Sequence, residues 1–165
     1  MSVHRIAGHA RRTLQRPSRR AAHRIRWPRL GGSCNTGRVM GCVFCEVLAG
    51  DALFLRGGHF AAFFDAFPVS PGHLLVVPLR HLESFFDFDE EEAEELYGFV
   101  ARCKKVLDKE FAPDAYNLGV NAGRSAGQTV MHAHIHLIPR YAGDTADPRG
   151  GVRGIFPGSA RYGVD

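Results

Sequence analysis

The sequence predicts an α+β domain in which a mainly antiparallel sheet packs against one long helix. One segment, residues 89–111, has apolar residues at helical spacing, and four apolar runs of strand length flank it. Glycine and proline clusters separate these runs, which is typical of hairpins and tight turns. Because the strands gather around a single helix and do not alternate with helices, the α+β class is favoured over a parallel α/β fold.

The first 39 residues differ from the rest of the chain in charge. They contain ten arginines and no Asp or Glu, and prolines interrupt them at positions 17 and 28. Residues 40–165 hold eleven Lys and Arg against seventeen Asp and Glu, a net charge of −6. We therefore predict a basic, disordered arm over 1–39, an acidic domain over 40–145 and a Gly- and Pro-rich tail over 146–165.

Three interpretations of the arm stay open. An Arg-rich, acid-free N-terminus is typical of a mitochondrial transit peptide, and it can also bind nucleic acid by neutralising phosphates. The third is a stretch upstream of a misassigned start, since the patterned sequence begins directly after Met40. We expect the third, and with it a cytoplasmic protein and no nucleic-acid partner.

Two further classes are disfavoured by composition. No window approaches 18 uninterrupted apolar residues, so we expect no membrane span. Four cysteines in 165 residues do not make a secreted-type disulfide framework, which favours a reducing compartment.

From Met40 onward the apolar pattern predicts a series of short elements. Residues 42–49 predict a short, largely buried turn or helix. Residues 60–65 and 72–79 predict two strands of a hairpin, because two prolines punctuate the stretch between them.

Residues 89–111 predict the long helix. Acidic residues occupy its first turn and lysines its last, as the helix dipole favours. Its predicted buried stripe consists of Ala93, Leu96, Val100, Cys103, Leu107 and Phe111. Two more strands, 116–121 and 132–140, follow, joined by a Gly-rich loop at 123–127.

The most informative segment alternates three histidines with three apolar residues over positions 132–137. In a strand, alternate side chains face opposite sides, so His132, His134 and His136 share one face and the apolar residues face the core. Three imidazoles on one face indicate either a metal site or a site for phosphate chemistry, and packing alone does not explain them.

This segment and its neighbours resemble the signature of the histidine triad (HIT) superfamily of nucleotide hydrolases and transferases. The resemblance runs from about Cys42 to Tyr141 and includes residues 63–65, 71–78 and 127–130 in the expected order. It implies a HIT-type five-stranded antiparallel sheet with one long helix. It also implies a homodimer paired through that helix and a strand edge.

The resemblance implies that His134 is the nucleophile. A neutral imidazole there would attack the α-phosphorus of a nucleotide and form a nucleotidyl-His134 intermediate, which divides one difficult displacement into two easier ones. Charge grows on the phosphoryl oxygens during transfer, so donors must converge on them. We assign His136 and Gln128 to catalysis and Thr129 to phosphate binding on this ground.

The resemblance also implies a nucleoside-binding set. Asp65 would accept from the 2′- and 3′-hydroxyls of ribose, and Asn121 would contact phosphate. Phe44 and Phe63 would line the base pocket. Each has a structural alternative: a solvated strand end for Asp65, a turn cap for Asn121 and a place in the core for the aromatics.

Cys42 and Cys45 form a Cys-x-x-Cys pair, which is half of a tetrahedral zinc site or a redox pair. The chain resembles zinc-containing bacterial HIT proteins, in which two histidines complete the site, here His81 and His132. We therefore predict structural zinc, with His132 as a metal ligand and not a proton shuttle. His73 is expected to be a strand residue with a backbone partner.

Two branches of the superfamily share the first chemical step and differ in the leaving group. The sequence Ile138-Pro139-Arg140-Tyr141 resembles the Fhit side, and the C-terminal tryptophan of the Hint side is absent, since the only tryptophan is Trp27. We predict hydrolysis of diadenosine tetra- or triphosphate, with Mg²⁺ helping to neutralise the polyphosphate. The alternatives are a purine nucleoside phosphoramidase and a non-enzymatic nucleotide-binding module.

Overall fold

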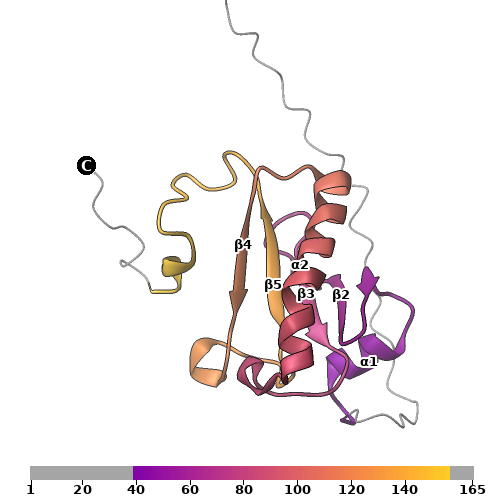
Figure 1. The fold of residues 1–165 in the computed structure, drawn as a ribbon. Coiled ribbons are helices and arrows are strands. Elements are labelled where there is room, and N and C mark those ends of the chain that lie inside the picture. Colours follow the sequence, from indigo (N-terminus) through magenta and orange to yellow (C-terminus); the bar gives the residue numbers. More distant parts are fainter. Residues whose placement is uncertain (1–38, 157–165) are drawn as a thin grey trace, which may run out of the picture.

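The computed structural model describes residues 39–156, which form a five-stranded antiparallel sheet with α-helices on both faces (Figure 1). The strands lie in the order β1-β2-β3-β5-β4. They span Leu55–Arg56 (β1), Phe60–Phe64 (β2), Leu74–Pro78 (β3), Ala115–Val120 (β4) and Ile135–Arg140 (β5). The helices are α1 (Val43–Ala49) and α2 (Glu90–Phe111), with 3₁₀ turns η2 (Phe85–Asp87), η3 (Arg124–Ala126) and η4 (Gly151–Ile155). The predicted α+β class, with an antiparallel sheet and one long helix, is confirmed.

The ends of several strands differ from the prediction. Strand β1 was not expected, and β3 and β5 begin later than the predicted residues 72 and 132. Gly72 has φ +83° and belongs to the turn, so it cannot continue a strand. The amide of Ala133 donates to the loop carbonyl of Leu82 at 2.6 Å, which bends the chain before β5. The predicted arm, apart from Val39, and the last nine residues of the tail lie outside the described residues.

The sheet serves two cores because alternate residues of each strand face opposite sides. In β2, Phe60 and Ala62 join the core under α2, whereas Ala61 and Phe63 join the core under α1. Helix α1 contributes Phe44, Val47 and Leu48 to its side. This arrangement buries β2 and β3 on both faces, and it leaves the α1 side of β5 to the histidines.

Helix α2 packs against the sheet with a phase slightly different from the predicted one. Ala93 is exposed, and the buried positions are Glu92, Phe99, Cys103 and Leu107. The helix begins with a capping box in which the Asp89 carboxylate accepts from the Glu92 amide, while the Glu92 carboxylate accepts from the Asp89 amide. Within residues 39–156, no helix is both long and apolar enough to span a membrane.

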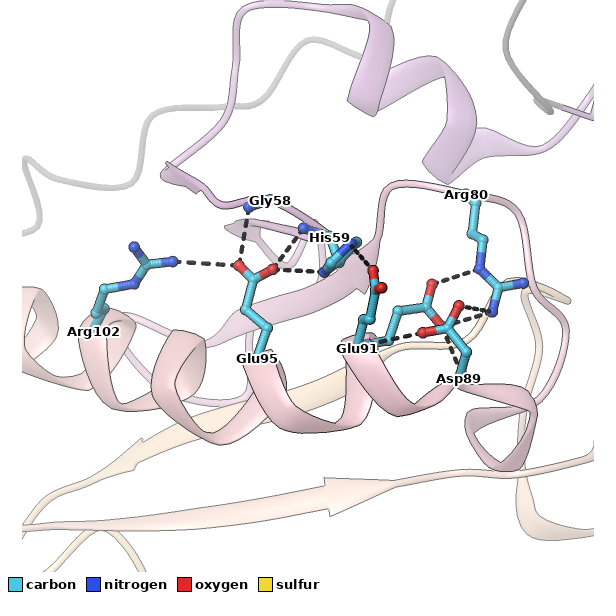
Figure 2. Close-up of polar contacts among 8 residues, drawn as sticks. Gly58, His59, Arg80, Asp89, Glu91, Glu95 and Arg102 are labelled. Atoms are coloured by element: carbon cyan, nitrogen blue, oxygen red, sulfur yellow. Dashed lines mark hydrogen bonds and ion pairs between the residues drawn. The ribbon is translucent and has the colours of Figure 1, made fainter.

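An ion pair with a half-exposed arginine explains why a buried glutamate occupies the core face of α2. Glu92 is 2% exposed, and its two carboxylate oxygens accept from Arg80 Nε at 2.5 Å and Nη2 at 2.7 Å. Arg80 also reaches Asp89 at 3.3 Å (Figure 2). The pair ties the start of α2 to the segment after β3, which carries His81.

A second, more exposed network lies one turn further along α2 (Figure 2). The Glu95 carboxylate accepts from the amides of Gly58 at 3.0 Å and His59 at 2.8 Å. Arg102 Nη2 lies 3.5 Å from the same carboxylate. The network fixes the β1–β2 turn to the helix.

We expect Arg80→Met to lower the free energy of unfolding by about 2 kcal/mol in urea titrations. Removing one partner of a fully buried pair costs ~3–5 kcal/mol, because the other charge is left unpaired. Arg80 itself is 45% exposed, which reduces the loss. The matched control is Arg102→Met, whose exposed pair with Glu95 should contribute less than about 1 kcal/mol. Equal losses in the two variants would contradict this account.

Candidate functional site

The three histidines lie where β5 begins, on the side of the sheet that carries α1. His136 is within β5, while His132 and His134 precede it in an extended segment. Exposure rises along the segment, from 0% at His132 to 6% at His134, and the His136 side chain is 22% exposed. On the opposite side, Ile135 and Leu137 are buried in the core under α2. The alternation predicted from the sequence therefore describes the arrangement, although the strand itself is shorter.

Two hydrogen-bonding directions determine the role of His132. Its Nε2 lies 3.1 Å from the carbonyl oxygen of Pro78. A carbonyl can only accept, so Nε2 carries the proton and Nδ1 keeps its lone pair. Nδ1 faces the sulfurs of Cys42 at 3.5 Å and Cys45 at 3.6 Å. Burial lowers the pKa of His132 to about 4, which keeps the imidazole neutral and able to bind a metal.

The predicted metal ligands come together in one cluster: Cys42, Cys45, His81 and His132. Their donor atoms all lie within 4.8 Å of one another. Tetrahedral zinc with ~2.3 Å bonds to sulfur and ~2.05 Å bonds to nitrogen requires S···N separations of about 3.6 Å. The measured separations are 3.5 Å for Cys42–His132, 3.5 Å for Cys45–His81 and 3.6 Å for Cys45–His132. The residues fit a structural zinc ion, with the Pro78 carbonyl orienting one ligand from behind.

His134 has the opposite tautomer. Its Nδ1 lies 2.8 Å from the carbonyl oxygen of His132, so Nδ1 carries the proton. The lone pair is then on Nε2, and His134 lines a cleft of about 620 Å³. Phe44 packs edge-on against the imidazole, with ring centroids 5.2 Å apart. The arrangement presents the Nε2 lone pair of His134 to the cleft in a fixed orientation.

Four of the five predicted substrate-binding residues line this cleft: Phe44, Asp65, Asn121 and Thr129. Asp65 is 15% exposed at the end of β2, and its Oδ1 accepts from the amide of Phe67 at 2.8 Å. Phe63 is the exception. It is 1% exposed and packs behind Phe44, with ring centroids 5.5 Å apart, so it supports the wall without forming it.

The structure gives Gln128 a position different from the predicted one. Its side chain is 3% exposed and does not line the cleft. Its oxygen accepts from the Gly123 amide at 2.7 Å, and its nitrogen donates to the carbonyls of Glu83 at 2.7 Å and Val130 at 3.1 Å. All three contacts are to backbone, because a buried amide must satisfy both ends. Gln128 braces the loop before the histidines, and no direct phosphate contact is assigned to it.

Sequence reasoning missed one histidine at the site. His73 lines the cleft, is 3% exposed, and has its Nε2 3.0 Å from His136 Nδ1. Asp65 Oδ2 lies 3.6 Å from His73 and 3.9 Å from His136. Strand alternation could have indicated that His73 lies beside His136. Residues two apart face the same side of a strand, so Leu75 shares a face with His73, and Leu75 pairs with His136 across the sheet. That pairing depends on sheet order, which the sequence pattern alone did not provide.

Two arginines of the tail, Arg149 and Arg153, are not part of the cleft lining. Arg149 pairs with Asp147 at 3.0 Å, and Arg153 belongs to η4. Turn η4 lies against β4, where Gly151 approaches the side chain of Asn117.

Comparison with known proteins gives a consistent result. A family model for the HIT domain matches residues 49–143. A solved HIT family protein from Bacillus subtilis has a TM-score of 0.60 and 34% identity, covering 72% of this chain and 89% of that one. A zinc-bound histidine triad family protein from Mycobacterium smegmatis has a TM-score of 0.59 and 31% identity, covering 66% and 81%. The asymmetrical bis(5′-nucleosyl)-tetraphosphatase of Schizosaccharomyces pombe is 36% identical over 104 residues, which is 63% of this chain and 57% of that protein.

We expect Cys42→Ser to lower the zinc content of the purified protein and its melting temperature together. Loss of an outer partner of a zinc ligand costs ~10–100-fold in affinity, and loss of a ligand should cost more. Cys103→Ala is the control, because Cys103 is fully buried in the other core and far from the donors. It should lower stability and leave zinc content unchanged, as measured by elemental analysis.

We also expect a difference in how stability depends on pH. As the pH is lowered from 6.5 to 4.5, the urea concentration at the unfolding midpoint should fall less steeply in His136→Asn than in the wild type. Burial lowers the pKa of His136 to about 4, against an ordinary value of 6.5. Below pH 6.5 the unfolded chain therefore binds a proton here that the folded protein does not. Stability from this group is present above pH 6.5 and is lost as pH falls toward 4. The cluster of Cys42, Cys45, His81 and His132 is the same in both proteins, so identical slopes would contradict the lowered pKa of His136.

Proposed function

The chain belongs to the HIT domain family, and on this premise we propose that it hydrolyses a nucleotide by nucleophilic attack of His134 on the α-phosphorus. The observation that carries the proposal is the 2.8 Å hydrogen bond from His134 Nδ1 to the His132 carbonyl, which leaves the Nε2 lone pair in the cleft. A histidine free to exchange tautomers would present a proton to the phosphate part of the time. Here the backbone prevents this exchange.

The reaction proceeds in two displacements. A bond forms between His134 Nε2 and the α-phosphorus, while the phosphorus–oxygen bond to the leaving group breaks. The intermediate carries positive charge on the imidazolium ring, and the His132 carbonyl stabilises it through Nδ1. Water then attacks the same phosphorus, the bond between His134 Nε2 and phosphorus breaks, and the mononucleotide leaves. One proton of the water passes to solvent, and the imidazole returns to its neutral form.

The cleft supplies the contacts that a nucleotide requires. The Asp65 carboxylate suits the ribose hydroxyls, and the side chains of Asn121 and Thr129, which line the same cleft as His134, suit the phosphate oxygens. Apolar side chains of Val43, Phe44 and Leu75 offer a surface for the base. We propose a purine nucleotide as the ligand.

We favour a dinucleoside polyphosphate as the substrate and thus the Fhit-like side of the family. The S. pombe relative, a bis(5′-nucleosyl)-tetraphosphatase by name, supports this choice. The second candidate is a purine nucleoside phosphoramidase, since the same attack by His134 would release an amine. The third is a nucleotide-binding module without turnover.

We further propose that the Cys42, Cys45, His81 and His132 cluster holds zinc with a structural role. The ion would join α1 to the segment that carries the nucleophile. Helix α1 places Phe44 against both His132 and His134, with centroids 5.9 Å and 5.2 Å apart. Through this packing, the metal cluster would fix the cleft wall without taking part in the chemistry.

A homodimer is the assembly we propose. Strand β4 is at an edge of the sheet, and its Leu118 is 51% exposed. Tyr97 on α2 is 84% exposed. An open strand edge with apolar side chains nearby is suited to pairing with a second copy.

His134→Ala should lower kcat by at least about 10³-fold while the Kd for a mononucleotide changes by less than about 3-fold. The nucleophile is lost, but the ribose and base contacts remain. Stopped assays measure the loss of kcat, and calorimetry measures the Kd for the mononucleotide. Residual activity within 10-fold of the wild type would refute the nucleophile assignment. The control is His59→Ala, a surface histidine paired with Glu91 and Glu95, which should leave both values unchanged.

The substrate class is tested by comparing kcat/KM for diadenosine tetraphosphate and an adenosine phosphoramidate, each with and without Mg²⁺. A preference of 10-fold or more for the dinucleotide is expected. The opposite preference would assign the protein to the phosphoramidase side and leave the His134 mechanism in place. Turnover of neither, with tight nucleotide binding, would favour the binding module.

A further inference from the structure

Besides His132 and His134, a second pair of histidines has hydrogen bonds that fix a tautomer: His73 and His136, which both line the cleft. His73 stands just before β3 and is 3% exposed. Its Nδ1 lies 3.3 Å from the backbone amide nitrogen of Val69, and its Nε2 lies 3.0 Å from His136 Nδ1. The two rings are tilted by 38°, with centroids 5.2 Å apart.

The chain of bonds has one consistent direction. A backbone N–H can only donate, so His73 Nδ1 accepts from Val69 and the His73 proton is on Nε2. That proton is donated to His136 Nδ1, which must therefore be unprotonated. The remaining His136 proton is on Nε2, the nitrogen that is not engaged with His73. His136 lines the cleft beside His134, with ring centroids 5.1 Å apart.

This direction holds while both rings are neutral. Burial lowers the pKa of His136 to about 4 and that of His73 below its ordinary value. Asp65 favours the protonated form of each, but its Oδ2 is 3.6 Å from His73 Nε2. The His136 nitrogen is closer, at 3.0 Å, and is the better acceptor position.

The loop that carries Val69 is held in place relative to the strand that carries His136. Ser70 Oγ donates to the carbonyl of Pro139 in β5 at 2.6 Å. The His73 amide donates to the Ser70 carbonyl at 3.2 Å. At Gly72, a Cβ would lie 3.2 Å from Pro139, so only glycine allows this close approach without displacing neighbours.

We propose that His73 is a positioning residue. It accepts a hydrogen bond from the Val69 amide at Nδ1 and therefore donates one from Nε2 to Nδ1 of His136. It holds His136 in the Nε2–H tautomer, which donates a hydrogen bond to an oxygen of the phosphoryl group under attack. No proton is transferred in this step. Rotation or tautomer exchange of His136 would instead point a lone pair at the phosphate oxygens and repel them. The part played during turnover rests on the proposed hydrolysis, whereas the tautomer itself does not.

Two polar substitutions at the same position separate the transmitted hydrogen bond from mere packing. The side-chain amide of Gln reaches the place of Nε2, so His73→Gln keeps a donor for His136. The shorter Asn places its amide near Nδ1, so His73→Asn can accept from Val69 but leaves His136 without its donor. Both variants remove the imidazole, so a purely structural role would affect them alike. Thermal unfolding establishes that each is folded.

The first readout is the tautomer, measured without any nucleotide by long-range ¹H–¹⁵N correlation of labelled imidazoles in the zinc-loaded full chain. We expect His136 to be protonated on Nε2 in the wild type and in His73→Gln, and to shift toward Nδ1 in His73→Asn. Wild-type protonation on Nδ1, or the same tautomer in both variants, would overturn the proposal. His59→Leu is the control and assigns one surface signal.

The second readout is turnover. Losing one donor to the transition state costs ~10²–10³-fold in kcat in other enzymes, and partial loss through tautomer exchange should cost about 10–100-fold. We expect this loss in kcat for His73→Asn, little change in KM, and recovery to within about 3-fold in His73→Gln. Equal losses in the two variants would overturn the proposal. A wild type that turns over no nucleotide, yet shows the expected tautomers, would instead refute the proposed function.

Discussion

The site depends on the fact that a neutral imidazole offers one proton and one lone pair, on opposite nitrogens. The backbone decides which nitrogen has which. The Pro78 carbonyl takes the Nε2 proton of His132, and the His132 carbonyl takes the Nδ1 proton of His134. Two neighbouring histidines of the same strand segment are thereby given opposite tautomers. One then faces the thiols with Nδ1, and the other faces the cleft with Nε2.

His132 is the residue through which the two centres are joined. Its ring belongs to the Cys2His2 cluster, and its carbonyl orients the imidazole of His134, two residues later. Phe44, between the two cysteines on α1, contacts both imidazoles. Displacing His132 would therefore disturb the metal cluster, the tautomer of His134 and the wall of the cleft at once.

Much of this could be predicted from the sequence, and the omissions have physical causes. The period of two over 132–137 identified the face that carries the histidines, since that period is local. The cluster of Cys42, Cys45, His81 and His132 came from a resemblance, because spacing alone left a redox pair open. His73 was assigned to the scaffold, since its partner depends on the β3–β5 register. Gln128 was misplaced because hydrogen-bond capacity does not reveal whether backbone or substrate uses it.

The long helix α2 also shows what the sequence pattern left undetermined, namely which of its side chains face the core. Its start, its end and its class followed from apolar spacing and charge, but Ala93 was placed in the core and Phe99 was not. The helical period fixes spacing and leaves rotation about the axis to be settled by packing. Glu92 could occupy the core face only because Arg80, on the segment between β3 and α2, neutralises it.

The contact between Cys42 and His132 joins residues 90 positions apart. Ribosomal synthesis releases α1 well before β5, so Cys42 can meet His132 only after the last strand has been made, although α1 already has β2 and β3 to pack against. Closing so long a loop costs conformational entropy that no local contact can offset beforehand. Completion of the Cys2His2 cluster therefore depends on the last strand of the sheet, whereas the core between α1, β2 and β3 is built from buried residues within 44–77.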